Sequence, residues 1–424
     1  MYQTAISIFS ASYIFMQLPS TILMSKLQPH IFLPSCIVTW AIISGCTGAT
    51  TNAAGLLVVR FCLGIVEAPF FPGSIYFLSC WYTKKELGVR MALLVSGLLL
   101  SNAFAGLISA GLLSGMNGVG GLAAWRWLFI IEGHATVVLG VVCFFVLPDY
   151  PGTTSWLSET EKVVAQARLV ADAGTEDEGV LSEDTTTIWQ GLSWAVQDYR
   201  TWLFACLQVA TTASISFSNF FPTVLQQLGI KSSTTVLLLT APPYLFTFTW
   251  AVSFAFDADK RQKRSPHAII SGLVAMAGTV CTVALPAEQR WPKYALTFVI
   301  CAGRFGIYSK TYTWLSSTIV QPRIKRACAI GVANTCANTA ALFSSYFWID
   351  KFQPQFKQSW ACVLGFQCLG MACILGLRYT LKRKNRQFDE LDQRNLGVAG
   401  IEAEGRVLSA DEKRAVNTGF RFIT

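Results

Sequence analysis

Long apolar runs follow one another along almost the whole chain, and they constrain its fold more than any other feature. A helix needs about 20 predominantly apolar residues to cross the hydrocarbon core of a bilayer. Eleven runs reach or approach this length: Thr4–Met24, Ile31–Thr51, Leu56–Cys80, Val89–Leu113, Ala124–Leu147, Trp202–Leu225, Thr235–Phe256, His267–Leu285, Tyr294–Trp314, Ala327–Trp348 and Trp360–Leu377. The sequence therefore predicts an all-α membrane protein with eleven transmembrane helices.

The composition agrees with this class and disfavours others. Of the 424 residues, 53% are hydrophobic and only 13% are charged, whereas a soluble domain has about 25% charged residues. The net charge of +9 does not indicate nucleic acid, because most basic residues lie in short loops, as membrane orientation signals do. The thirteen cysteines show no metal spacing, and no nucleotide or hydrolase motif is present. We therefore expect no enzyme, no cofactor and no metal site.

One long polar segment divides the chain. Residues 148–200 contain the stretch TEDEGVLSEDTTT, whose composition is typical of a solvated linker. Loops richer in Lys and Arg are cytoplasmic, which places this linker and the C-terminus in the cytoplasm. The sequence predicts an N-terminal helix bundle over residues 1–147, a cytoplasmic linker over 148–200, a C-terminal helix bundle over 201–380 and a cytoplasmic tail over 381–424.

Two charges interrupt the run LLVVRFCLGIVEAPFFPGSIYFLSC, namely Arg60 and Glu67. A charge at the bilayer centre costs about 2.5 to 3.5 kcal/mol on insertion scales, so such residues are rarely accidental. Their spacing of seven places both on one helix face, about 10 Å apart. A fixed cation beside a titratable acid predicts a membrane protein that handles an anion and a proton. The alternative is a structural ion pair that orients the helix.

Several motifs resemble the anion:cation symporter branch of the major facilitator superfamily. They are RFCLGIVEAPFFPG at 60–73, WRWLFIIEG at 125–133, LPDYP at 147–151 and DADKR at 257–261. The chain looks most like fungal permeases for allantoate, nicotinate and pantothenate. The resemblance implies a twelve-helix major facilitator fold, built from halves of six. Because only five helices are expected before the linker, the first transmembrane helix of the family is expected to be missing, through a late start or a truncation.

The resemblance also implies an activity. It predicts a monomeric secondary transporter at the plasma membrane that couples uptake of a small organic anion, such as a vitamin-like or ureide carboxylate, to protons. Glu67 would bind the proton and Arg60 would attract the substrate carboxylate. The expected partners are the substrate, the proton and the lipid bilayer. Three alternatives stay open: an exporter of an acidic secondary metabolite, a non-transporting sensor, and a truncated, non-functional product.

Glu132 and His134 are further candidates for carrying a proton. Both lie within the expected helix Ala124–Leu147, and His titrates near neutral pH. A packing and hydrogen-bonding role at the start of this helix is the alternative, and the family pattern also has Glu132.

Arg304 lies near the middle of another expected helix, between Gly303 and Gly306. No family motif requires an arginine there. Small neighbours allow another helix or a ligand to approach closely. We expect Arg304 to contact the anionic substrate. Otherwise it pairs with an acid that the sequence does not identify.

Uncharged polar residues also lie in the apolar runs and could hydrogen-bond an amide or a heteroaromatic substrate. Asn334 and Asn338 share one helix face by their spacing of four. The predicted substrate-binding residues of this kind are Gln208, Asn219, Asn334 and Asn338, and Gln17 and Asn102 are similar in character. Structural hydrogen bonds between helices, worth about 0.6 kcal/mol each, explain these residues equally well.

Overall fold

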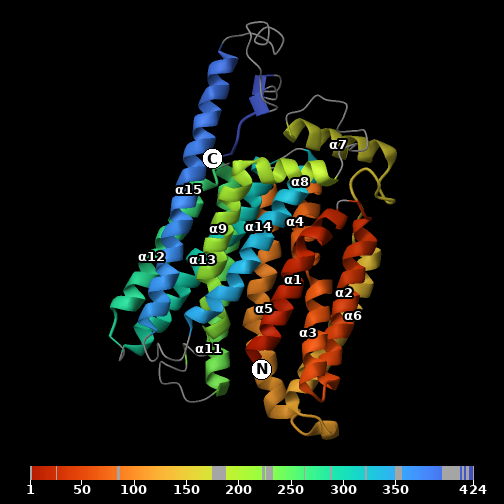
Figure 1. Ribbon diagram of the computed structural model, residues 1–424, viewed down its shortest axis with the longest axis vertical. Coiled ribbons are helices and arrows are strands. Elements are labelled where there is room, and N and C mark those ends of the chain that lie inside the picture. The colour runs from red at the N-terminus through yellow and green to blue at the C-terminus, as the bar shows by residue number, and fades with distance from the viewer. Residues whose placement is uncertain are drawn as a thin grey trace.

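The structure is a computed structural model. It describes residues 2–24, 26–83, 86–173, 188–221, 225, 233–261, 263–286, 289–319, 322–348, 356–393, 411–412, 415–416 and 420–423. All secondary structure within these ranges is helical, which confirms the predicted all-α fold. The long helices run side by side along the long axis of the molecule, and α7 and α8 lie across one end (Figure 1). We call this the linker end.

The helices before the linker are α1 (Tyr2–Met24), α2 (Pro29–Cys46), η1 (Thr47–Ala49), α3 (Ala53–Glu67), α4 (Phe70–Trp81), α5 (Leu87–Gly115), η2 (Val119–Gly121) and α6 (Ala124–Val146). The linker contains α7 (Glu159–Ala173) and α8 (Ile188–Gln197). The helices after it are α9 (Tyr199–Ile215), η4 (Ser216–Phe220), α11 (Ser233–Arg261), α12 (Ser265–Ala284), α13 (Arg290–Thr318), α14 (Arg323–Ser344), η5 (Ser345–Phe347) and α15 (Lys357–Asp392).

Within the described residues, each of the eleven expected runs lies mainly on one of these helices or on a consecutive pair. Within the described residues, seven spans are long and apolar enough to cross a membrane by length and composition. The expected helices at α1, α9, α13 and α14 do not reach that standard. Most residues of α9, α13 and α14 are buried by neighbouring helices, so these helices need less apolar surface than a helix that faces lipid.

The run that holds Arg60 and Glu67 is broken rather than continuous. Helix α3 ends at Glu67 and α4 begins at Phe70. Proline has no backbone N–H and its ring crowds the preceding turn, so Pro69 and Pro72 interrupt the ladder of helical hydrogen bonds. The break leaves Glu67 at a helix end inside the molecule, which is a common setting for binding sites in transporters.

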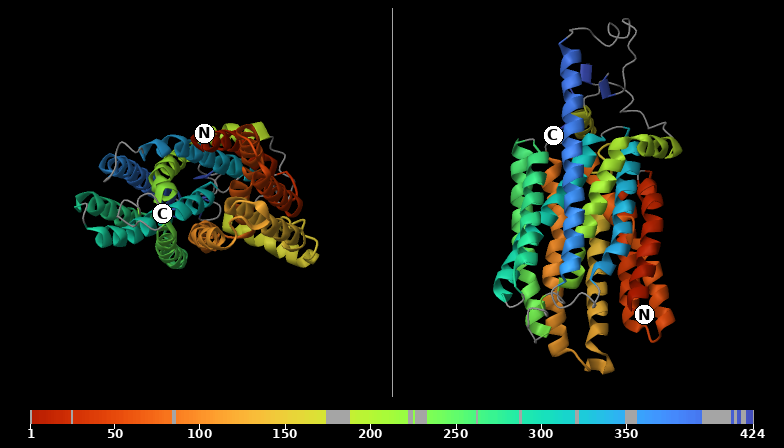
Figure 2. Two further views of the ribbon diagram at one scale, coloured as in Figure 1. Left: turned by 90° about the horizontal axis from the view of Figure 1, so that it is seen from below. Right: turned by 60° about the vertical axis from the view of Figure 1, so that its left-hand side comes forward.

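The helices form two groups that meet along two seams. In the first group (α1–α6), α2 packs on α6 and α1 on α3, and in the second group (α9–α15), α9 packs on α14 and α12 on α13. The seams between the groups are α5 against α11 and α1 against α14, and the view from below shows both pairs (Figure 2). The division of the chain into two bundles with the boundaries given above stays a prediction.

One seam is closed at the linker end by a carboxylate. Asp259 of α11 accepts a hydrogen bond from the backbone N–H of Val89 (2.8 Å) in the first turn of α5. The N-terminus of a helix favours negative charge. Gly88 makes the approach possible, because a Cβ there would lie 2.1 Å from Asp259 Oδ1.

The linker and the tail contain more structure than expected. Helix α7 begins with a capping box, in which Ser158 and Glu161 bond each other's backbone and side chain. Helix α15 continues to Asp392 through a polar stretch without Gly or Pro, past the expected boundary at residue 380. The stretch TEDEGVLSEDTTT lies outside the described residues.

A buried ion cluster joins several segments at the linker end. Arg200 donates to both oxygens of Asp198 (2.8–3.1 Å) and to Asp411 of the tail (2.9 Å). Lys325 of α14 donates to Asp198 as well (2.8 Å). Burial by itself raises the pKa of Asp198, but the hydrogen bonds and charges of Arg200 and Lys325 outweigh burial and hold this pKa well below its usual range. We call these four residues the linker-end cluster.

Candidate functional site

Glu67 lies half-buried at the end of α3, directly against α1. One turn earlier, a Cβ on Gly64 would lie 2.1 Å from Ser12 Oγ and 2.5 Å from the carbonyl oxygen of Phe9. Only glycine allows α1 and α3 to approach so closely. The approach brings Tyr13 within electrostatic reach of Glu67, and Tyr13 hydrogen-bonds to Gln17.

Aromatic rings from both helix groups meet next to these residues. Phe71 of α4 stacks on Tyr308 of α13 with ring centroids 6.0 Å apart. It also meets Tyr312 edge-on at 5.5 Å. The Tyr312 hydroxyl donates to Asn334 Oδ1 of α14. The rings therefore connect the first helix group to the second at the depth of Glu67.

Amide side chains complete this site. Asn338 Nδ2 donates to Gln17 Oε1 (3.1 Å) across the seam between α1 and α14. Gln208 of α9 is buried beside Tyr312. Among the described residues, neither amide atom of Gln208 has a partner with hydrogen-bond geometry, and neither does Asn334 Nδ2. Buried polar groups are normally satisfied, so the site holds unused donors and acceptors.

We call this group the central cluster: Tyr13, Gln17, Glu67, Phe71, Gln208, Tyr308, Tyr312, Asn334 and Asn338. It combines a titratable carboxyl, flat aromatic surfaces and unsatisfied amides between two helix groups. Such a site can bind a small polar molecule that carries a planar or hydrogen-bonding group, and can take up a proton.

Arg60 does not form an ion pair with Glu67. Its guanidinium lies over the ring of Phe129 of α6, 6.0 Å from the centroid, and within the described residues no ion pair shorter than 4 Å joins the two charges. The two still interact electrostatically over a longer distance. The charge of Arg60 is therefore available to a third group near Glu67.

The other predicted proton carriers lie elsewhere. Glu132 and His134 are exposed on α6, and His134 Nδ1 lies 2.8 Å from the carbonyl oxygen of Ile130, one turn back on the same helix. The structure does not bring either of them to Glu67. Nearby Arg126 donates to the carbonyl oxygens of Gly48 and Thr50 (3.0 Å each), as a structural residue does.

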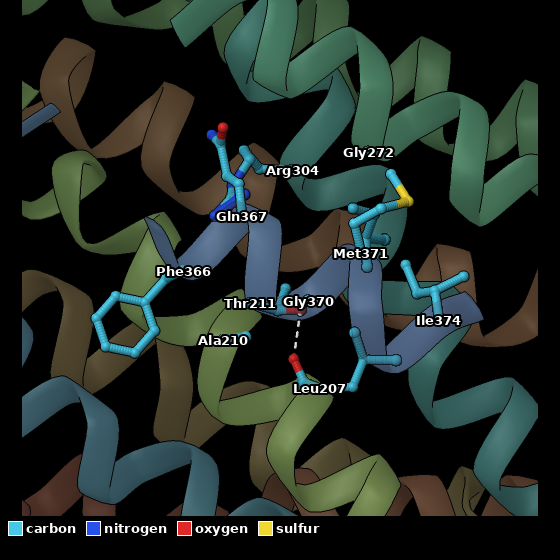
Figure 3. Close-up of a pocket in the computed structure, with 11 residues that line it drawn as sticks. Leu207, Ala210, Thr211, Gly272, Arg304, Phe366, Gln367, Gly370, Met371 and Ile374 are labelled. Carbon is cyan, nitrogen blue, oxygen red and sulfur yellow. Dashed lines mark hydrogen bonds between the residues drawn. The ribbon is translucent and has the colours of Figure 1, made fainter. Parts of the chain in front are cut away.

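Arg304 faces a small pocket inside the second helix group (Figure 3). The walls come from Leu207 and Thr211 of α9, Gly272 of α12, and Gln367 and Met371 of α15. The side chain is only 2% exposed. Arg304 is thus buried on α13 one helical turn before Tyr308, a residue of the central cluster.

Comparison with known proteins decides the class. The model of the Major Facilitator Superfamily matches residues 1–345. The chain belongs to this superfamily. Its members of known function are transporters rather than enzymes, and the relatives named below are transporters too.

Three relatives illustrate the similarity. The chain is 34% identical over 319 residues to the MFS transporter prlL of Fungal sp. (strain NRRL 50135), covering 75% of this chain and 63% of the relative. It is 29% identical to the MFS-type transporter cnsO of Penicillium expansum, covering 100% and 81%. It is 27% identical to the putative metabolite transport protein NicT of Pseudomonas putida, covering 91% and 86%. The chain thus spans less than two thirds of the first relative's length.

Sequence reasoning missed part of the site in this facilitator. Charges and amides stand out in an apolar run more than aromatic rings do, so Tyr13, Phe71, Tyr308 and Tyr312 are not among the predicted site residues. The spacing of four between the two tyrosines of α13, in a run already marked by Arg304, was the available signal. The side chain of the predicted substrate residue Asn219 lies outside the described residues.

Proposed function

We propose that this facilitator is a proton-coupled symporter that takes up a small organic anion, such as a vitamin-like or ureide carboxylate, at the plasma membrane. The observation that carries the proposal is the position of Glu67. This carboxyl lies at a helix break between the two helix groups, beside Tyr13 and without an ion-pair partner within 4 Å among the described residues. A carboxyl in such a place can exchange its proton when the groups move.

The substrate side of the proposal rests on the neighbours of Glu67. Arg60 supplies a positive charge that no carboxylate of the described residues approaches within 4 Å. Gln208, Asn334 and Asn338 supply amide groups, and Arg304, one turn of α13 before Tyr308, supplies a second cation. Asn219 stays a substrate residue predicted from the sequence. The motifs shared with fungal allantoate, nicotinate and pantothenate permeases favour a carboxylate. Alternating access by rocking of the two helix groups around this site is the expected cycle, in a monomer.

Uptake of labelled carboxylates tests the coupling. The carrier is expressed in yeast cells that lack their own permeases, and accumulation of nicotinate, allantoate and pantothenate is compared at pH 5 and pH 7. Glu67→Gln keeps the size of the side chain but removes its titration. We expect accumulation against a gradient to be lost, while exchange of internal for external substrate persists.

Glu132→Gln is the matched control, because the same change is made on the exposed face of α6. With equal surface expression, this variant is expected to accumulate substrate as the native carrier does. Unchanged accumulation in Glu67→Gln, with loss in Glu132→Gln or His134→Gln, would move the proton site to α6 and overturn the proposal.

A further inference from the structure

Arg304 is a buried cation for which the described part of the chain supplies no partner. Its Nε and Nη2 atoms have no hydrogen-bond partner there. On the same helix, Lys310 is also buried, but its Nζ donates to the carbonyl oxygen of Gly306 (2.9 Å) and lies over the Phe254 ring at 5.3 Å. Arg304 therefore differs from its neighbour in pairing rather than in burial.

Among the described residues of the second helix group, no carboxylate pairs with Arg304. Between Arg200 and Arg378 the only carboxylates are those of Asp257, Asp259, Glu288 and Asp350. The first two lie at the linker end of α11, where they bond Arg261 and the N-terminus of α5. Glu288 and Asp350 lie beyond the ends of α12 and α14, outside the described residues. A buried charge without a counter-charge costs several kcal/mol, so the site needs an anion from outside the chain.

The geometry points to a site at Arg304 for a small monovalent anion, inside the second helix group, in a pocket that Glu67 does not line. The anion is either a halide ion or the carboxylate group of the transported substrate. The guanidinium presents Nε–H and Nη2–H side by side, a fork that matches a carboxylate and also attracts a halide. Neither group requires Glu67 to carry a proton, so the inference does not depend on the proposed coupling.

The walls of the pocket fit a small anion better than a whole organic molecule. The free space is about 10 Å³, room for about one water molecule. The Ser271 hydroxyl of α12 lies next to Gly306 of α13 and has no hydrogen-bond partner among the described residues. Met371 is a flexible wall that can move outward to enlarge the space.

Thermal unfolding of the purified full chain in detergent tests this site. The midpoint is measured in sodium isethionate, whose anion is a sulfonate and serves as the reference, and in sodium chloride and sodium acetate at constant ionic strength. A ligand that binds only the folded state raises stability as its concentration exceeds its dissociation constant. We expect a saturable rise with chloride, acetate or both, and at least a tenfold loss of apparent affinity in Arg304→Gln. The matched control Lys310→Gln removes the other buried cation of α13 and is expected to keep the rise.

The three salts separate the sources of the anion. A rise with chloride alone identifies a halide site, whereas a rise with acetate alone identifies the position of a substrate carboxylate. If Arg304→Gln does not fold, Arg304→Lys tests the site instead. Lysine keeps the positive charge but not the two parallel N–H groups, so this variant should bind acetate more weakly than the native protein. The inference is overturned if no anion raises the native midpoint, or if the Arg304 variants respond like the native protein. The midpoint shift does not measure transport, so failure of the coupling proposal is seen separately, in the uptake by Glu67→Gln.

Discussion

Arg200 and Arg304 are both buried arginines of the second helix group, with 7% and 2% exposure, yet their surroundings are opposite. Arg200 donates to two carboxylates, Asp198 and Asp411, and lies over the Phe422 ring at 5.4 Å. Arg304 has no such partner among the described residues. Burial alone therefore does not distinguish a structural cation from a functional one. What distinguishes them is whether the chain itself supplies the counter-charge.

Removing the Asp198 carboxylate from the linker-end cluster is the most direct test of this difference. Asp198→Asn leaves buried Arg200 and half-buried Lys325 with one carboxylate fewer. Breaking a buried pair in this way costs about 3 to 5 kcal/mol, so we expect a large fall in the unfolding midpoint. Arg261→Gln is the control, because its pair with Asp257 is exposed and worth at most about 1 kcal/mol. Equal effects of the two changes would show that the cluster is not a structural unit.

A smaller effect is expected where a single carboxylate closes the seam between the groups. Gly88→Ala places a methyl group where Asp259 now bonds Val89, so the carboxylate must withdraw. A hydrogen bond to a charged group contributes about 1.5 to 3 kcal/mol. Gly97→Ala, also on α5, meets open space and should stabilise the helix by up to about 1 kcal/mol. We expect the two alanine variants to shift the unfolding midpoint in opposite directions.

A neutral hydrogen bond across the other seam should matter least for stability. Asn338→Ala removes the donor to Gln17 Oε1. Hydrogen bonds between membrane helices average about 0.6 kcal/mol, so the expected loss is close to the limit of measurement. Transport affinity, in contrast, should fall if Asn338 binds substrate. A loss of stability as large as that of Asp198→Asn would assign Asn338 to structure instead.

The contribution of the linker-end cluster to stability should not change with pH near neutrality. Because the pKa of Asp198 is lowered in the folded state, the folded chain binds fewer protons there than the unfolded chain. The contribution of Asp198 to stability is therefore complete at pH values above its pKa in the unfolded chain, about 3.9, and is lost as the pH falls below that value. The difference in unfolding midpoint between native protein and Asp198→Asn should stay constant from about pH 8 to pH 5. A difference that shrinks already at pH 6 would contradict this pairing.

The sequence by itself determined the helical membrane fold, because runs of about 20 apolar residues have few other solutions. It also determined that Arg60, Glu67 and Arg304 are charges within apolar runs, and that no acid lies in the same span as Arg304. Pro69 and Pro72 were visible as breakers next to Glu67, although the run reads as one continuous span by hydropathy. Each of these statements depends only on residues close together in the chain.

Only the tertiary structure decided which side chains meet. Lipid is as apolar as the interior of a helix bundle, so hydropathy does not tell an inward face from an outward one. For that reason the sequence could not show that Glu132 and His134 face outward on α6, or that Tyr13 and Tyr312 approach from opposite groups. The close contact at Gly64, which places α1 against α3, and the seam between α1 and α14 set those faces. Helix packing, and not local pattern, therefore assembled the central cluster around Glu67.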